Sequence, residues 1–168
     1  MPNFDDFKLA VEAMTGGKNT VLFDDMGMPS VMVPFPKMKI AEIMSGGSQN
    51  IHPAFSVGGV EKDVLYVSKF QNIVLNDRAY SLPMRDPKVY VTFDQALTFC
   101  RNKGKGWSLN PYSLWSAIAL WCRKNGTMPR GNNFWGKDYT YQHEKGVPCA
   151  WESKEAESHP GEPARCLT

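Results

Sequence analysis

The sequence predicts an α+β fold in which two helices pack on short antiparallel strands. The first 70 residues contain short β-branched runs separated by glycine-containing turns, and residues 92–126 contain two segments with helical apolar spacing. The chain has 168 residues, of which 42% are hydrophobic and 21% are charged. A chain of this length and composition can bury one sizeable core, so a disordered or fibrous protein is excluded.

The N-terminal segment is expected to begin with a short helix. Asn3 can cap it, and Asp5 and Asp6 fall in the first turn, where the helix dipole favours carboxylates. Gly16-Gly17 is a typical helix end. The spacing predicts one apolar face, formed by Phe4, Phe7, Val11 and Met14.

Two hairpins are expected next. The first joins residues 20–23 to 30–33 through the acidic turn 24–27, and the prolines around its second strand predict that this strand is short or lies at a sheet edge. The second would join residues 54–57 to 64–70 through Gly58-Gly59.

The two later helices have clear boundaries in the sequence. Thr92 and Gln95 form a capping box, and Gly104 or Gly106 would end the first helix. Asn110 followed by Pro111 would cap the second. The inner faces would be Phe93, Ala96, Leu97 and Cys100, and then Leu114, Ile118, Trp121 and Cys122. We expect both faces to point into one shared interior.

Composition predicts three parts along the chain. Residues 1–50 would form the helix and first hairpin, and residues 51–143 the core with its two helices. Residues 144–168 contain five glutamates, three prolines and little apolar periodicity, which indicates an irregular tail.

Charge and hydropathy exclude some classes of partner. Nineteen Lys and Arg against 17 Asp and Glu leave a net charge of +2, without the basic stripe typical of nucleic-acid binders. No apolar run approaches the roughly 18 residues of a membrane span, and the acidic N-terminus does not resemble a secretory signal. We therefore expect neither nucleic-acid binding nor membrane insertion.

The sequence contains no catalytic or metal-binding pattern that we can assign. The possible zinc ligands His143, Cys149, His159 and Cys166 lack the close pairs that fix half of a tetrahedral site. Cys100 and Cys122 fall on apolar helix faces, which is typical of buried structural cysteines. The sequence therefore predicts a protein without a cofactor, a bound metal or an enzymatic activity.

Residues 131–139 are the candidate binding segment, because they mix glycine, asparagine and aromatic residues. Aromatic rings provide rigid contact area and amides provide adaptable hydrogen bonds. The alternative is that Phe134 and Trp135 pack back over the helices. The candidate ligand-binding residues are Asn132, Asn133, Phe134, Trp135 and Tyr139.

Three segments resemble the formylglycine-generating enzyme (sulfatase-modifying factor) superfamily. Residues 91–100 resemble its V-S-W-x-x-A-x-x-F-C helix, residues 107–115 the step into its second helix, and residues 64–72 an earlier strand. Residues 29–34 and 119–133 are more similar to a phage and prophage subset, the variable proteins of diversity-generating retroelements. The resemblance, over about residues 29–138, implies a C-type-lectin-like fold.

The resemblance also has a limit. The family's G-N-V-W-E-W motif and the cysteine context near it have no counterpart here, so no catalytic residue can be carried over. The chain would then be a fragment, or a frameshifted or shortened relative, that stops where the family's second half begins.

The resemblance implies a phage or prophage structural protein that recognises a receptor without catalysis. Its partner would be a host cell-surface protein or glycan, with other phage structural proteins or further copies of itself as possible neighbours. It would be located in the virion, or in the bacterial cytoplasm before assembly. The alternatives are a formylglycine-generating-type oxidoreductase, a degenerate fragment of one, and a virion subunit without a ligand.

Overall fold

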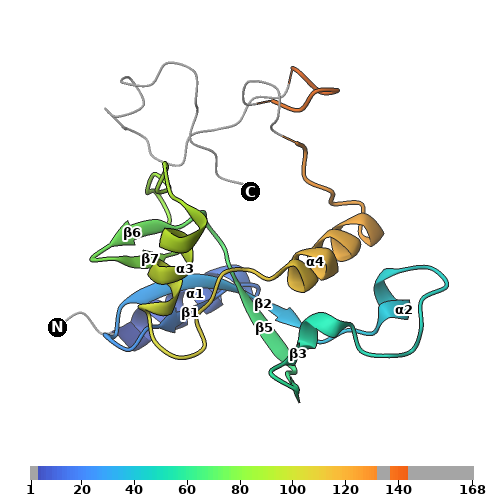
Figure 1. Cartoon of the computed structure of the whole chain (residues 1–168), viewed down its shortest axis with the longest axis horizontal. Helices are drawn as coiled ribbons and strands as arrows, with labels where there is room; N and C mark the ends of the chain where they lie inside the picture. Colours follow the sequence, from blue (N-terminus) through green and yellow to red (C-terminus); the bar gives the residue numbers. More distant parts are fainter. Residues whose placement is uncertain (1–3, 132–136, 144–168) are drawn as a thin grey trace. The chain divides into compact units, whose positions relative to one another are not determined.

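The computed structural model describes residues 4–131 and 137–143, and it confirms a mixed α+β architecture (Figure 1). The strands form one three-stranded sheet in the order β1-β2-β5 and two two-stranded sheets, β3-β4 and β6-β7. In chain order the elements are α1 (Phe4–Thr15), β1 (Thr20–Phe23), β2 (Pro29–Pro36), α2 (Ile40–Ile43), the 3-10 helix η1 (Pro53–Phe55), β3 (Ser56–Val57), β4 (Val60–Glu61), β5 (Val64–Ser68), β6 (Ile73–Leu75), β7 (Arg78–Tyr80), α3 (Phe93–Arg101) and α4 (Tyr112–Lys124).

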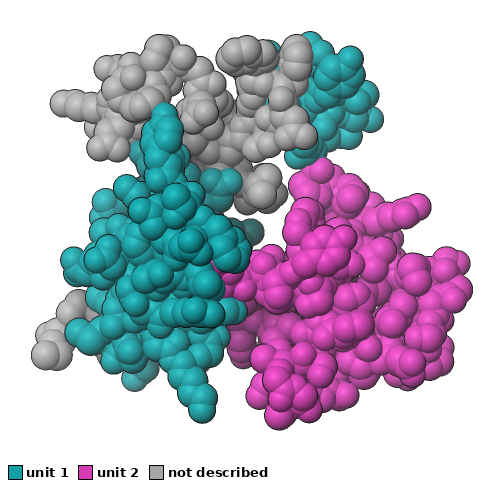
Figure 2. All heavy atoms as spheres, viewed as in Figure 1, with its two compact units in different colours: residues 1–32, 68–108, 130–168 teal, residues 33–67, 109–129 magenta. Residues whose placement is uncertain are grey.

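The chain folds into two compact units, coloured separately in Figure 2. Unit 1 comprises residues 1–32, 68–108 and 130–168, and unit 2 comprises residues 33–67 and 109–129. Each unit therefore combines segments that are distant in the sequence. The expected division at residues 50 and 143 stays a prediction, and the expected tail, 144–168, lies outside the described residues.

Helix α1 and the first hairpin form as predicted, but the exposed side of the helix differs. Strand β1 pairs antiparallel with β2, in a register that places Thr20 opposite Met32 and Phe23 opposite Pro29. The Thr20 hydroxyl donates to Glu12 Oε1 at 2.6 Å. Helix α1 thus joins β1 partly through polar contacts, and Met14, expected on its packed face, is 87% exposed.

The prediction that the proline-containing strand is short or lies at an edge is wrong. Strand β2 has eight residues and lies between β1 and β5. Its pairing with β1 involves only residues 29–32, so Pro34 and Pro36 fall outside that ladder. A proline is tolerated where no partner requires its missing N–H.

The second hairpin has a different partner from the one predicted. Gly58 and Gly59 connect β3 to β4, and both have positive φ, +57° and +78°. This two-residue turn places Val57 opposite Val60, so the hairpin closes before residue 64 is reached. Strand β5 instead joins the three-stranded sheet, and residues 54–55 lie in η1.

A third hairpin, which we did not predict, pairs β6 with β7. Asn76 and Asp77 connect the two strands with φ of +49° and +56°. Asparagine and aspartate tolerate this left-handed conformation better than other non-glycine residues, so this pair can form the tight turn between the two strands. Asn102, just after α3, donates through Nδ2 to the Asp77 carbonyl at 2.8 Å.

Helix α3 has the predicted capping box. Thr92 Oγ1 accepts from the Gln95 N–H at 3.3 Å, and Gln95 Oε1 accepts from the Thr92 N–H at 2.9 Å. Cys100 is buried, as expected from its face. Phe93, however, which is the first residue of α3, is 72% exposed.

Helix α4 belongs to unit 2 and begins one residue later than predicted. Pro111 is the N-cap rather than the first helical residue, since its carbonyl accepts from the N–H groups of Leu114 and Trp115. Leu114 and Ile118 join the core as predicted, whereas Trp121 is 41% exposed. The buried core of unit 2 is formed by Phe35, Met38, Ile43, Ala54, Phe55, Leu114 and Ala117.

This core overturns the expected shared interior of the two long helices. It contains no residue of α3, which lies in unit 1, and Phe93 is directed toward solvent. Each helix packs on elements of its own unit: α3 contacts strand β7, and α4 contacts the short helices η1 and α2.

Candidate functional site

Of the five predicted binding residues, the structure describes only one. Tyr139 is 75% exposed. Its neighbours in the predicted segment, Asn132, Asn133, Phe134 and Trp135, lie outside the described residues. The candidate site is therefore built from the residues that flank them, 130–131 and 137–143.

The Asp138 carboxylate organises this region. Its Oδ2 accepts from the Gly131 N–H at 2.8 Å, and its Oδ1 accepts from the N–H groups of Thr140 and Tyr141 at 2.9 and 3.1 Å. The bond from Gly131, with the others, lowers the pKa of Asp138 below its ordinary value. The carboxylate is thus ionised at neutral pH, and it holds residue 131 beside residues 138–141.

A cation and two tyrosines lie at this turn. The Arg130 guanidinium stacks over the Tyr141 ring, 3.3 Å from its centroid. The exposed Tyr139 precedes Tyr141 by two residues, and the Tyr139 carbonyl accepts a hydrogen bond from Gln142 Nε2 at 3.2 Å. Exposed tyrosine rings and a flat guanidinium can stack on a planar or ring-shaped ligand.

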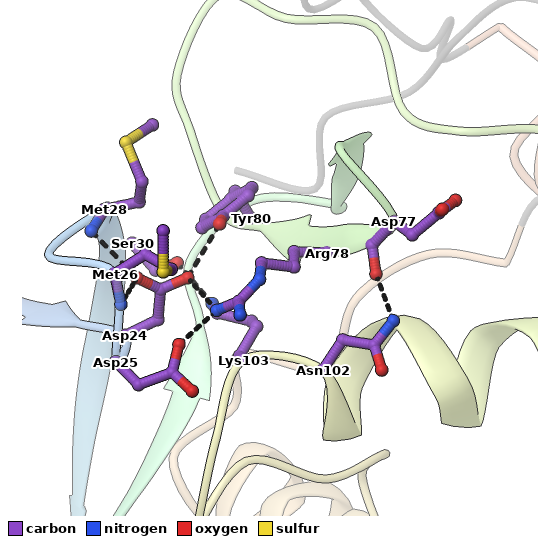
Figure 3. Close-up of polar contacts among 10 residues, drawn as sticks. All are labelled: Asp24, Asp25, Met26, Met28, Ser30, Asp77, Arg78, Tyr80, Asn102 and Lys103. Atoms are coloured by element: carbon purple, nitrogen blue, oxygen red, sulfur yellow. Dashed lines mark hydrogen bonds and ion pairs between the residues drawn. The ribbon is translucent and has the colours of Figure 1, made fainter.

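A second polar arrangement lies in unit 1 and centres on Asp24 (Figure 3). Asp24 Oδ1 accepts from the N–H groups of Met26 and Met28, so the acidic turn forms as the sequence indicates. Its Oδ2 accepts from the Tyr80 hydroxyl at 2.7 Å and from Arg78 at 3.1 Å. The Asp24 carboxylate thus connects the acidic turn to strand β7 through hydrogen bonds.

The environment of Asp24 favours its ionised form. Burial opposes ionisation, but the hydrogen bonds from Tyr80, the two backbone N–H groups and Arg78 outweigh it and lower the pKa of Asp24. The same burial and the bond to Asp24 raise the pKa of Tyr80 to about 12. Arg78 also contacts Asp25, whose side chain is half exposed.

Lys103 is buried beside this network, with only 3% of its surface exposed. Its Nζ donates to Ser30 Oγ at 2.7 Å and lies over the Trp107 and Tyr80 rings, 3.4 and 4.8 Å from their centroids. Burial lowers the pKa of Lys103 to about 8. Sequence reasoning missed this residue, because a lysine in the run Lys-Gly-Lys-Gly after a helix is typical of a solvent-exposed turn.

A lysine with a lowered pKa beside a serine is a combination that some enzymes use for nucleophilic catalysis. Here Ser30 is fully buried and Lys103 almost so, and a substrate cannot reach either group without opening the fold. The cluster of Asp24, Arg78, Tyr80, Ser30 and Lys103 therefore supports the structure of unit 1 in this conformation.

Two free cysteines lie in the described part of the chain, the buried Cys100 and the partly buried Cys122. Burial raises the pKa of the Cys100 thiol, and Cys122 lies in the other unit. Within residues 4–131 and 137–143, no three His, Cys, Asp or Glu side chains lie close enough to hold a metal ion. Cys149, His159 and Cys166 lie outside these residues.

Two further observations bear on identity. Among the described residues, no helix combines the length and the apolar character that crossing a membrane requires. The chain matches no known protein family and no curated protein. The motif resemblance described above is therefore still a prediction, and the function has to be argued from the site itself.

Proposed function

We propose that this protein is a non-catalytic recognition protein that binds its ligand at the turn formed by residues 130–131 and 137–143. The observation that carries the proposal is the Asp138 carboxylate, which holds Gly131 and Tyr141 while Tyr139 remains 75% exposed. A turn that is ordered before binding loses less conformational entropy when a ligand docks. Tyrosine adds contact area at a low entropic cost, because it has only two side-chain torsions to fix.

The finer form of the proposal concerns the biological setting. Residues 29–34 and 119–133 resemble the variable proteins of diversity-generating retroelements in phages and prophages, within the superfamily that residues 91–100 and 107–115 resemble. In that setting the protein would be a virion component with a C-type-lectin-like domain, and the ligand would be a host-surface glycan or protein. A stacking site of tyrosine and arginine suits the ring faces of a glycan, which supports the glycan over the protein.

The oxidoreductase alternative requires two neighbouring cysteines that bind copper. Burial raises the pKa of the Cys100 thiol, which disfavours the thiolate that copper binding requires. The candidates for such a pair would be Cys149 and Cys166. Stoichiometric Cu(I) binding that requires both thiols, together with oxidation of a cysteine peptide, would replace our proposal.

The binding proposal is tested with the full chain on an array of bacterial surface glycans and on intact bacterial cells. Tyr139→Ala should weaken binding about tenfold, as expected when an aromatic anchor is removed. Tyr112→Ala is the matched control, since Tyr112 is 85% exposed but lies in unit 2. Equal binding by both variants would show that the ligand binds elsewhere, and no binding by the wild type to any glycan or cell would favour a virion subunit without a ligand.

A further inference from the structure

An open pocket of about 580 Å³ is lined by residues of unit 2 alone. This volume is within the range of small-molecule sites in proteins. One wall is α2 with the turn after it, and the other is the last turn of α4. The lining residues are Ala41, Glu42, Ile43, Met44, Ser45, Leu120, Arg123 and Lys124.

The α2 wall is fixed by backbone hydrogen bonds. The N–H groups of Ile40 and Ala41 donate to the carbonyls of Asn50 and Ser48 at 3.0 and 2.9 Å, which closes the loop around α2. Gly47 makes this closure possible, because a Cβ there would lie 2.8 Å from the backbone of Ile40. The pocket wall is therefore preformed.

The α4 wall presents two cations on one side of the helix. Leu120, Arg123 and Lys124 have the i, i+3, i+4 spacing that places side chains on one helical face. Lys124 Nζ donates to the Glu42 carbonyl, which joins this wall to α2. Within the described residues, Arg123 has no ion-pair partner, and its side chain is exposed.

The backbone carbonyls at the end of α4 accept hydrogen bonds from groups other than these two cations. The Trp121 carbonyl accepts from the Asn125 N–H and Nδ2, at 3.1 and 2.8 Å, and the Cys122 carbonyl accepts from the Thr127 N–H at 2.9 Å. The residues that follow α4 thus cap the helix. The Arg123 guanidinium is therefore available to pair with a ligand.

The charge and the surface of the pocket indicate its ligand class. Glu42 is the acidic residue among those that line it, and its Oε2 already accepts from the Lys39 N–H at 2.6 Å. The remaining lining is largely apolar, with the buried Ile43 and the half-exposed Met44 on the α2 side. A ligand that fits has an apolar body and one negative charge.

We propose that this pocket binds a small amphiphilic organic anion. The acid group pairs with the Arg123 guanidinium, assisted by Lys124, and the apolar body covers Met44 and Leu120. The site is separate from the turn assigned to recognition, so either assignment can fail without the other.

The experiment compares two fluorescent probes that differ mainly in charge. Anilinonaphthalene sulfonate is an aromatic anion, and N-phenyl-1-naphthylamine has a similar ring system without the sulfonate. The full chain should bind the anion at least about tenfold more tightly than the neutral probe at low salt, and added salt should reduce this difference. Amide chemical-shift changes on binding should be confined to residues 40–47 and 120–127.

Variants separate the contribution of the charge from that of the pocket volume. Arg123→Gln should weaken binding of the anion about tenfold and leave the neutral probe unchanged, whereas Ser45→Phe should fill the pocket and weaken both. Lys62→Gln, at an exposed lysine of the same unit outside the pocket, should change neither. Equal affinity for the two probes, shift changes elsewhere in the chain, or the same loss from Lys62→Gln and Arg123→Gln would overturn the proposal. Circular dichroism checks that each variant remains folded.

Discussion

The two units of this protein bury different kinds of groups. Unit 2 is centred on apolar side chains, with Phe35 stacked on Phe55 at 6.0 Å and 14° and the helix residues Leu114 and Ala117 beside them. In unit 1, polar and charged residues lie at the centre beside apolar ones. Of the five buried polar residues in the described chain, Asp24, Ser30, Ser81 and Lys103 are in unit 1, and only His52 is in unit 2.

This difference predicts how each unit responds to change. An apolar core depends on filled volume and is insensitive to pH, whereas a buried polar network depends on direction and charge. Unit 1 should therefore respond most to the loss of a single hydrogen-bonding group and to titration. Unit 2 should respond most to the loss of buried volume.

The largest expected effect comes from the centre of unit 2. Phe55→Ala should lower the unfolding free energy of this unit by about 4 kcal/mol, because Phe55 is fully buried and its removal leaves a cavity. Amide hydrogen exchange of α4 measures the change. Phe93→Ala, the same substitution at a 72% exposed site in α3, should cost less than about 0.5 kcal/mol. Similar losses from both would contradict the separation of buried from exposed aromatic residues.

The next effect tests the network of unit 1. Asp24→Asn removes the charge that Arg78 and Tyr80 contact, and it should lower the unfolding free energy by about 3 kcal/mol. Asp25→Asn is the matched control, because Asp25 also contacts Arg78 but its side chain is 53% exposed. Its loss should cost less than about 1 kcal/mol. If urea unfolding shows equal costs, the buried carboxylate does not organise this unit.

The sequence was sufficient to predict elements that depend on neighbouring residues. The capping box of Thr92 and Gln95 and the positive-φ pair Gly58-Gly59 appeared where local chemistry requires them. The strand partners were not predictable in the same way, because the pairing of β2 with β5 depends on residues more than 25 positions apart. The Asn76-Asp77 turn could have been recognised, since both residue types favour such turns.

The candidate sites depended on long-range contacts even more strongly. Nothing near Lys103 in the sequence indicates that Ser30 and Tyr80 surround it. Likewise, the pocket in unit 2 brings residues 41–45 beside residues 120–124. The exposed Tyr139 was predicted because a run rich in glycine, asparagine and aromatic residues is a local feature. The hydrogen bond from the Gly131 N–H to Asp138, which fixes these residues beside each other, was not predicted.

The third prediction concerns the pH response of unit 1. Because the pKa of Lys103 is lowered to about 8, the unfolded chain binds a proton between pH 8 and 10 that the folded chain has released. The stability of the wild type should therefore rise over this range, by about 2 kcal/mol at most.

Lys103→Met should remove this rise, because methionine has a similar length and no titrating group. The exposed neighbour Lys105→Met should retain it. Urea unfolding followed by circular dichroism at pH 7.5, 8.5 and 9.5 measures the slope, below the range in which Tyr80 adds an opposite effect. Cys100, whose thiol pKa is raised by burial, opposes the rise near pH 9 in the wild type and in both variants, so the comparison between them isolates Lys103. A wild-type slope that persists in Lys103→Met would assign the titration to another group.

The smallest expected effect is the pH response of His52, the single buried polar residue of unit 2 in the described chain. His52 caps η1, with Nδ1 accepting from the Ala54 N–H at 3.3 Å, and burial lowers the pKa of its imidazole. The unfolded chain therefore binds a proton more readily, and stability is lost as pH falls below about 6.5. His52→Asn keeps a capping acceptor without this titration, so the loss between pH 6.5 and 5.5, about 1 kcal/mol or less, should disappear from the α4 amides. If it remains, carboxylates such as Asp63, whose pKa is lowered by Lys37, control the acid response of unit 2 rather than His52.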